Sequence, residues 1–177
     1  MRALLLLLVL SSSLFAQDLT LTVEASLNGF SSDIHRFGFK DFALSGLDQY
    51  DLPEPPLPPS DFIAICFAVP DPDVPFPNRW REDYRNVEDF KDMIEVWEMH
   101  VTTDQTAGDI EFYFTLEEGP SDHLFLKFKT ETSIKSVPLP SSVILPLDEL
   151  SSPILLEMWS DEMIANDKSS WGMMKYL

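Results

Sequence analysis

The sequence predicts an all-β domain, built as an antiparallel β-sandwich of about seven or eight short strands. Three observations lead to this prediction. Residues 19–27 alternate between apolar and polar side chains, residues 62–69 form an apolar run between Pro59 and Pro70, and residues 110–116 alternate again. Alternation with a period of two is typical of a half-buried strand, and a short apolar run between prolines favours a fully buried one. A closed barrel is the alternative arrangement.

Residues 1–16 predict a signal peptide in front of this domain. Arg2 supplies a positive charge, Ala3 to Leu10 is apolar and mostly leucine, and small residues lead to Ala16. This is the order of an export signal, and the apolar stretch is far shorter than the ~20 residues of a spanning helix. We therefore expect a secreted or cell-surface protein with its domain over 17–160. An uncleaved membrane anchor is the alternative.

The first strand is expected over 19–27, where every odd-numbered residue is apolar and every even-numbered residue is polar. One face of this strand should therefore be buried. Asn28-Gly29 follows as a turn signal, and a second strand is expected over 34–39.

A proline-rich stretch, Leu52-Pro-Glu-Pro-Pro-Leu-Pro-Pro59, interrupts the strands. Proline lacks the amide donor that a sheet requires, so this stretch is predicted to be extended in polyproline-like geometry. The apolar run that follows contains Cys66, the only cysteine, which we interpret as a small buried thiol because no cationic residue flanks it in the sequence. A single cysteine cannot form a disulfide within the chain.

Further strands are expected in the second half. Residues 70–86 look irregular, and 93–103 predict a strand, with a short helix over 87–99 as the rival interpretation. Residues 110–116 and 124–128 flank Glu118-Gly119-Pro120 and together predict a β-hairpin. Weaker strands are expected over 143–147 and 154–159, and the tail 161–177 has no convincing period.

The chain is strongly acidic, with 30 Asp and Glu against 12 Lys and Arg and a net charge of −18. Nucleic acid and anionic membranes repel such a surface, so neither is expected as a partner. No stretch after the signal is apolar for long enough to predict a membrane-spanning helix. A protein or a glycan is therefore the expected class of partner.

The segment from Leu19 to Lys129 resembles an immunoglobulin-like β-sandwich module of exported proteins of the Bacteroidetes type. The residues that carry the resemblance are Phe37-Gly38-Phe39, Gly46-Leu-Asp48, Tyr50-Asp51, Pro53-Glu-Pro-Pro-Leu-Pro-Pro59, Phe62, and Trp97 ahead of the segment 109–128. The resemblance implies a non-catalytic structural role outside the cell, with no cofactor and no catalytic residue carried over.

Modules of this family are often followed by the C-terminal sorting domain of the type IX secretion system. That sorting domain is not recognisable after residue 130, and Leu44 and Ser45 replace the small and acidic residues that usually precede the glycine. The chain is therefore expected either to stand alone or to be the front part of a longer polypeptide.

The residue content predicts that the protein is not an enzyme. Its three histidines, His35, His100 and His123, are scattered, and no Gly-x-Ser-x-Gly motif accompanies them. Pairs of carboxylates carry little information among 30 acidic residues, and one cysteine with three separate histidines does not form a zinc motif.

Calcium is the metal that the sequence favours if one is bound, because it takes carboxylate and carbonyl oxygens. Asp48 with Asp51, and Asp71 with Asp73, place carboxylates in loops near prolines. The sequence has no Asp-x-Asp-x-Asp-Gly loop, so solvated loop acids are the simpler interpretation of both pairs.

A second candidate site combines aromatic and basic residues. Trp80, Tyr84 and Arg81 stand together with Arg79 and Arg85. Tryptophan and tyrosine can stack on sugar rings and arginine can hold a carboxylate, which would suit a glycan or a peptide. The simpler interpretation is that the aromatic residues pin a long loop while the arginines pair with Glu82 and Asp83.

These observations leave three hypotheses for function. The first is a non-catalytic exported or cell-surface module with a structural, adhesion or assembly role. The second is a carbohydrate-binding module, with or without calcium. The third is a small secreted hydrolase.

Overall fold

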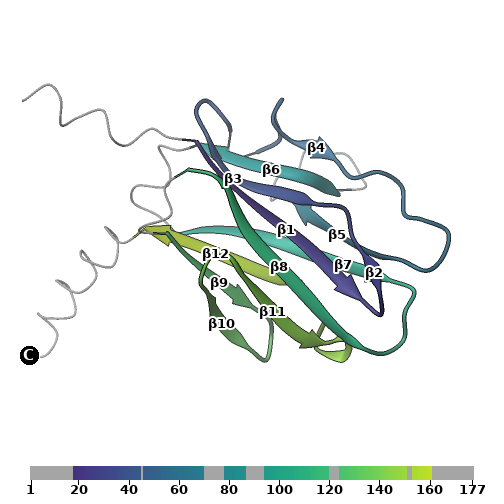
Figure 1. Ribbon diagram of the computed structural model, residues 1–177. Helices are drawn as coiled ribbons and strands as arrows, with labels where there is room; N and C mark the ends of the chain where they lie inside the picture. Colours follow the sequence, from purple (N-terminus) through teal and green to yellow (C-terminus); the bar gives the residue numbers. More distant parts are fainter. Residues whose placement is uncertain are drawn as a thin grey trace, which may run out of the picture.

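The computed structural model describes residues 18–44, 46–69, 78–86, 94–119, 124–150 and 153–160, so the predicted signal peptide and the tail 161–177 lie outside the described residues. These residues form strands and one short 3₁₀ helix, η2 (Figure 1). In chain order the elements are β1 Leu19–Leu27, β2 Phe30–Ser31, β3 His35–Lys40, β4 Leu52–Pro53, β5 Ile63–Ala68, β6 Trp80–Asn86, β7 Glu95–Thr103, β8 Asp109–Glu118, β9 Leu124–Lys129, β10 Ile134–Val137, β11 Ser141–Pro146, η2 Leu147–Leu150 and β12 Ile154–Ser160.

The strands join in one 12-stranded mixed sheet that nearly closes into a barrel. Its order is β10-β9-β12-β7-β5-β6-β3-β1-β8-β11, with β2 paired to β1 and β4 paired to β6. Only the β3–β6 pair is parallel among the described strand pairs. The two end strands approach each other, and Lys135 Nζ on β10 donates a hydrogen bond of 2.9 Å to the carbonyl of Ile144 on β11.

The all-β class is confirmed. The strands outnumber the seven or eight that were expected, and their single, nearly closed sheet corresponds to the alternative of a barrel. Within the described part of the chain, no helix has the length and hydropathy needed to cross a bilayer.

Strand β1 confirms its prediction over the full length. Its odd-numbered residues are all buried and belong to the core. Asn28 and Gly29 then form the turn into β2, with φ of 53° and 87°. Positive φ at both central residues is what a two-residue type I′ hairpin turn requires, which explains the choice of asparagine and glycine.

Aromatic rings fill much of the interior. Trp97 on β7 lies between Phe37 and Phe39 of β3, with ring centroids 5.4 Å apart in each pair. On the other side, Phe128 of β9 contacts Phe112 and Phe114 of β8. Edge and tilted contacts of this kind stabilise a core beyond the burial of their area.

The predicted hairpin of residues 110–116 and 124–128 is wrong. Strand β8 pairs with β1 and β11, whereas β9 pairs with β10 and β12. The two strands face each other through their phenylalanine side chains rather than through backbone hydrogen bonds. A shared apolar alternation indicates a shared core but does not specify an edge-to-edge partner.

The other strand predictions had mixed outcomes. Residues 95–103 form the expected strand and not a helix, and the buried run corresponds to β5. Strand β6, however, lies within 70–86, which was expected to be irregular. Its sequence, WREDYRN, lacks apolar alternation, because the residues that it buries are aromatic or charged.

Candidate functional site

The two aromatic residues of the predicted ligand site are both buried on β6. Trp80 is 8% exposed, packs in the core and donates from Nε1 to Asn78 Oδ1 at 2.8 Å. Tyr84 is 2% exposed, and Lys40 Nζ lies 3.9 Å from its ring centroid. Burial raises the pKa of Tyr84 to about 12, and the nearby charge of Glu82 acts in the same direction. Structural contacts thus occupy both rings.

Arg81 and Arg79, two of the three arginines near these rings, contact different partners. Arg81 is half-buried, donates from Nε to the carbonyl of Ile34 at 3.3 Å and pairs with Asp33 at 3.4 Å. Arg79 lies by Cys66, where burial raises the pKa of the thiol and the hydrogen bond with Arg79 opposes that rise. The buried thiol is as expected, but a cation lies beside it in space. These arginines do not converge on one site.

Arg85 is the centre of a charged group between the end of β6 and the start of β7. Strand β5 pairs with β6 only at Phe67–Trp80, so side chains bridge the end of β6 and the start of β7. Arg85 Nη1 pairs with Glu95 at 2.9 Å and its Nη2 with Asp83 at 3.5 Å. Its guanidinium also lies 4.9 Å from the ring centroid of Trp97.

This charged group, Asp83–Arg85–Glu95, connects β6 to β7 through side chains. Trp97 Nε1 donates a hydrogen bond of 3.2 Å to the carbonyl of Asp83. This indole donor takes the place of the backbone amide that a neighbouring strand would supply. Burial raises the pKa of Asp83, and the charge of Arg85 opposes that rise. Arg85 Nε is buried without a hydrogen-bond partner among the described residues. Sequence reasoning associated Arg85 with Asp83 but missed Glu95, because only the fold brings β7 beside β6.

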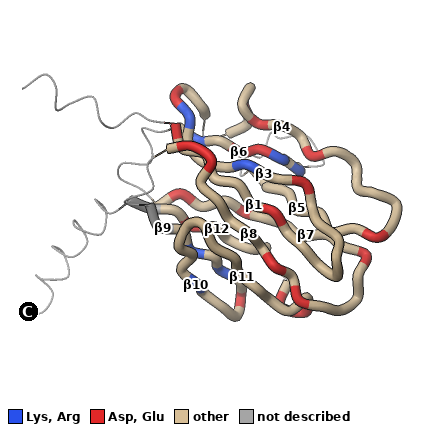
Figure 2. The backbone as a smooth tube through the Cα atoms, viewed as in Figure 1, with Lys and Arg blue, Asp and Glu red and all other residues tan. Residues whose placement is uncertain are grey.

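Figure 2 shows basic residues gathered around β3 and β6 and around β9 to β11 of an otherwise acidic molecule.

Asp48 and Asp51, the first predicted calcium pair, are used as acceptors for backbone amides. Asp48 accepts from the amides of Leu44 at 2.5 Å and Tyr50 at 2.7 Å. Asp51 accepts from the amides of Asp48 at 2.8 Å and Tyr84 at 3.1 Å. Burial raises the pKa of Asp51 to about 6, although its two amide hydrogen bonds favour the charged form.

The second pair, Asp71 and Asp73, lies outside the described residues. Among the residues that the structure does describe, no three His, Cys, Asp or Glu side chains are grouped so that they could hold a metal ion. The turn that contains Asp48 and Asp51 instead connects its own backbone to β6.

The described histidines are each paired with a glutamate. His35 is fully buried, and its Nε2 lies 2.8 Å from Glu54 Oε2. His100 lies on the surface of β7, 2.7 Å from Glu98 Oε1. His123 is outside the described residues. His35 and His100 therefore belong to two separate pairs rather than to one constellation.

The proline-rich stretch 52–59 runs along the outside of the barrel between β4 and β5 (Figure 1). Its start is held by pairing of β4 with β6 and by the Glu54 amide, which donates to the carbonyl of Arg79 at 2.9 Å. Just beyond its end, Asp104 accepts from the amides of Asp61 at 2.5 Å and Phe62 at 3.1 Å. The predicted extended course is consistent with this path, which leaves all five of its prolines exposed.

A shallow, open depression of about 440 Å³ lies at η2. Val101, Thr103, Leu147 and Leu150 contribute to its lining, and Asp148 is its one ionisable residue. Leu147 and Leu150 pack against the core, so their side chains cover it. The depression is open and lacks the converging polar groups that are typical of a ligand site.

No protein-family model matches the chain, and no characterised protein or solved structure matches it significantly.

Proposed function

We propose that this protein is a non-catalytic module that acts through its outer surface, in adhesion or in assembly with another protein. The observation that supports this proposal is that the side chains able to bind a ligand or to catalyse a reaction are engaged in contacts within the protein. Trp80 and Tyr84 are buried, Asp51 binds backbone amides, and the described histidines form separate pairs with glutamates. These contacts stabilise the fold, which leaves the outer surface as the part able to act.

The proposal includes export to the cell surface or the medium. Residues 1–16 support it through their charge and apolar pattern. The motif residues from Phe37 to Phe62 support membership of the immunoglobulin-like module family, and type IX secretion is the route that this membership would imply. The intact mass of the native product tests cleavage, because loss of residues 1–16 would leave a chain that begins at Gln17.

Photo-crosslinking in the producing cell tests the surface role. The full chain would carry photoreactive groups at exposed positions such as Tyr113 and Ile134. A surface-acting module should give discrete protein adducts at some positions and not at others. Absence of adducts at every position would overturn the proposal.

A glycan array with the purified full chain tests the carbohydrate-binding alternative. The module role predicts no glycan retained above background, with calcium or with a chelator. Retention that disappears on chelation would transfer the proposal to a calcium-assisted carbohydrate-binding module.

A further inference from the structure

The exposure of the proline-rich stretch repeats every three residues. Glu54 and Leu57 are half-buried, whereas Pro55, Pro56, Pro58 and Pro59 are exposed. The pattern continues towards the N-terminus, where Asp51 is buried and the next two residues, Leu52 (48% exposed) and Pro53, are exposed. The stretch has no cis peptide bond.

A period of three is the period of the polyproline II helix, which has three residues per turn and rises about 3.1 Å per residue. Such a helix has three edges. Glu54 lies on the edge that faces the barrel, where it contacts His35, and the half-buried Leu57 shares this edge three residues later. The other two edges carry prolines that face solvent, Pro55 with Pro58 on one and Pro56 with Pro59 on the other. We call these two edges the proline ridge.

The proline ridge is held in place from both ends. Glu54 binds His35 through its carboxylate and Arg79 through its amide. Hydrogen bonds from the amide of Phe62, and then from that of Asp61, hold the pKa of Asp104 below its ordinary value. Between these anchors, residues 55–60 make no hydrogen bond with another described residue. The ridge is therefore fixed at its ends and open along its length, which lowers the entropy that a partner would have to remove.

We infer that the proline ridge is a docking surface for a protein that recognises polyproline helices through a groove of aromatic side chains. Such grooves bind Pro-x-x-Pro segments, using the low conformational entropy of the polyproline helix. Pro55 with Pro58 and Pro56 with Pro59 both have this spacing. This inference rests on the proposed role of a surface-acting module and names the class of its partner.

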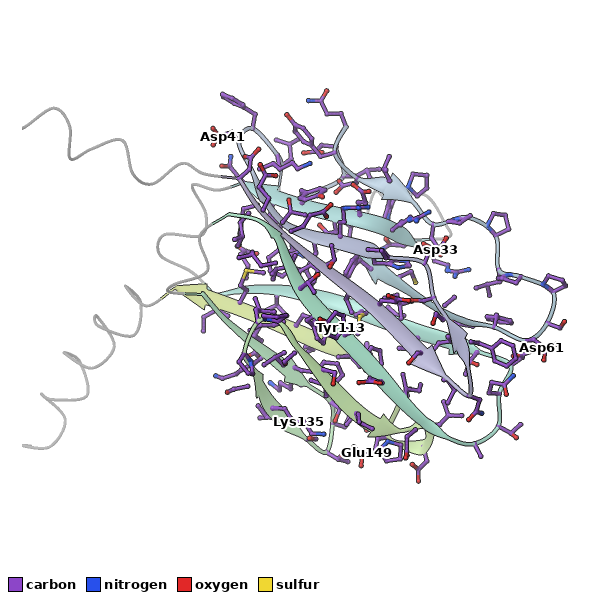
Figure 3. All side chains as sticks on the ribbon, in the orientation of Figure 1. Asp33, Asp41, Asp61, Tyr113, Lys135 and Glu149 are labelled. Atoms are coloured by element: carbon purple, nitrogen blue, oxygen red, sulfur yellow. The ribbon has the colours of Figure 1, made fainter. Side chains whose placement is uncertain are left out.

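The charges beside the ridge add a second property of the partner. Asp33 and Asp61 are exposed near its two ends (Figure 3), and Asp33 is paired with Arg81 whereas Asp61 forms no ion pair with a described residue. The whole chain carries a net charge of −18. A groove with a basic rim is therefore the complementary surface, and its association should slow as salt concentration rises.

Binding to a panel of purified SH3, WW and EVH1 domains tests the inference with the full chain. We expect at least one domain to bind in isothermal titration calorimetry. Each edge has its own double variant, Pro55→Ala/Pro58→Ala for one and Pro56→Ala/Pro59→Ala for the other. At least one of the two should weaken that binding about tenfold or more, since prolines on one edge act together. Pro138→Ala, which changes an exposed proline outside the ridge, is the matched control and should leave binding unchanged.

Two outcomes would overturn the inference. One is no binding by any domain of the panel, and the other is binding that both double variants leave intact. Circular dichroism of each variant shows whether it is folded, and a synthetic peptide of residues 50–62 that displaces the domain provides a readout independent of folding.

The crosslinking experiment separates this inference from the proposed function. If both double variants keep the protein adducts of the wild type, the module role stands and the ridge is not its docking surface. If the wild type itself forms no adducts, the proposed function fails whatever the domain panel gives.

Discussion

The imidazole of His35 and the carboxylate of Glu54 meet at 2.8 Å, with side chains that are 0% and 7% exposed. His35 Nδ1 lies 2.9 Å from the carbonyl of Asp33, which can only accept, so Nδ1 carries a proton. The other ring nitrogen, Nε2, faces the Glu54 carboxylate, so the imidazole bridges Asp33 and Glu54. This pair connects the proline-rich stretch to β3.

Replacing Glu54 with glutamine should lower the free energy of unfolding by about 1–3 kcal/mol, because a buried charge-assisted hydrogen bond is lost. The surface pair of His100 and Glu98 provides a matched control. Its distance is 2.7 Å, but its side chains are 42% and 46% exposed. Glu98→Gln should therefore cost less than about 0.5 kcal/mol. Urea unfolding at pH 7 measures both variants, and equal losses would mean that burial does not strengthen the pair at His35.

Replacing Asp51 with asparagine should change how stability depends on pH. The folded-state pKa of Asp51 is raised from 3.8 to about 6, so between these values the folded state holds a proton that the unfolded state releases. The contribution of Asp51 to stability is therefore largest below pH 3.8 and is lost as pH rises through about 6. The asparagine side chain of the variant is always neutral, so the wild type should gain stability relative to Asp51→Asn as pH falls from 7 to 4.

Asp104 provides a control of opposite sign. It also accepts two backbone amides, but it is exposed and its folded-state pKa is lowered. Its contribution is present above the unfolded pKa and is lost as pH falls, so the wild type should lose stability relative to Asp104→Asn over the same range. Urea unfolding of the three proteins at several pH values measures both differences. Curves that shift in the same direction would contradict the assignment of burial as the dominant effect at Asp51.

Replacing Arg85 with methionine should destabilise the protein by about 3–5 kcal/mol, because Asp83 would keep a buried charge and Glu95 a half-buried one without their partner. The loss should shrink at lower pH, where protonation of Asp83 removes one of these charges. Arg36→Met is the control, since Arg36 pairs with Glu117 and Glu82 near the surface. It should cost about 1 kcal/mol or less. Thermal unfolding at pH 7 and pH 5 checks both parts, and a loss that does not depend on pH would contradict the role assigned to Asp83.

The limits of the sequence predictions have a physical cause that a comparison of β1 with β6 makes clear. Strand β1 was predicted residue by residue because apolar alternation is local and encodes a buried face directly. In β6 the inward residues Asp83 and Arg85 are charged, and they are buried only because Glu95 and Trp97 arrive from β7. That compensation depends on contacts distant in the sequence, so no local pattern reports it.

The candidate site was limited in the same way. Sequence chemistry identified Trp80 and Tyr84 as side chains able to bind a ligand, but it could not tell whether the core or solvent would take them. The proline-rich stretch was predicted to be extended. Its two exposed edges became visible only when the structure showed Glu54 in contact with His35 and Leu57 half-buried, although their spacing of three was present in the sequence.

Gly38 gives the most direct test of the fold, because β3 approaches β1 closely at this residue. Its φ is +148°, and a Cβ atom there would lie 2.0 Å from the carbonyl oxygen of Leu19. Gly38→Ala should therefore force β1 and β3 apart, with a loss of about 3 kcal/mol or more or a failure to fold.

Gly29→Ala is the matched control. Gly29 also has a positive φ, +87°, but an added Cβ would meet nothing within 4 Å. Only backbone strain remains, so the expected loss is about 1 kcal/mol. Soluble yield and thermal unfolding of both variants decide the matter. A Gly38 variant as stable as the Gly29 variant would mean that β1 does not lie against β3 in the register Thr20 to Gly38, and the order of the barrel strands would have to be revised.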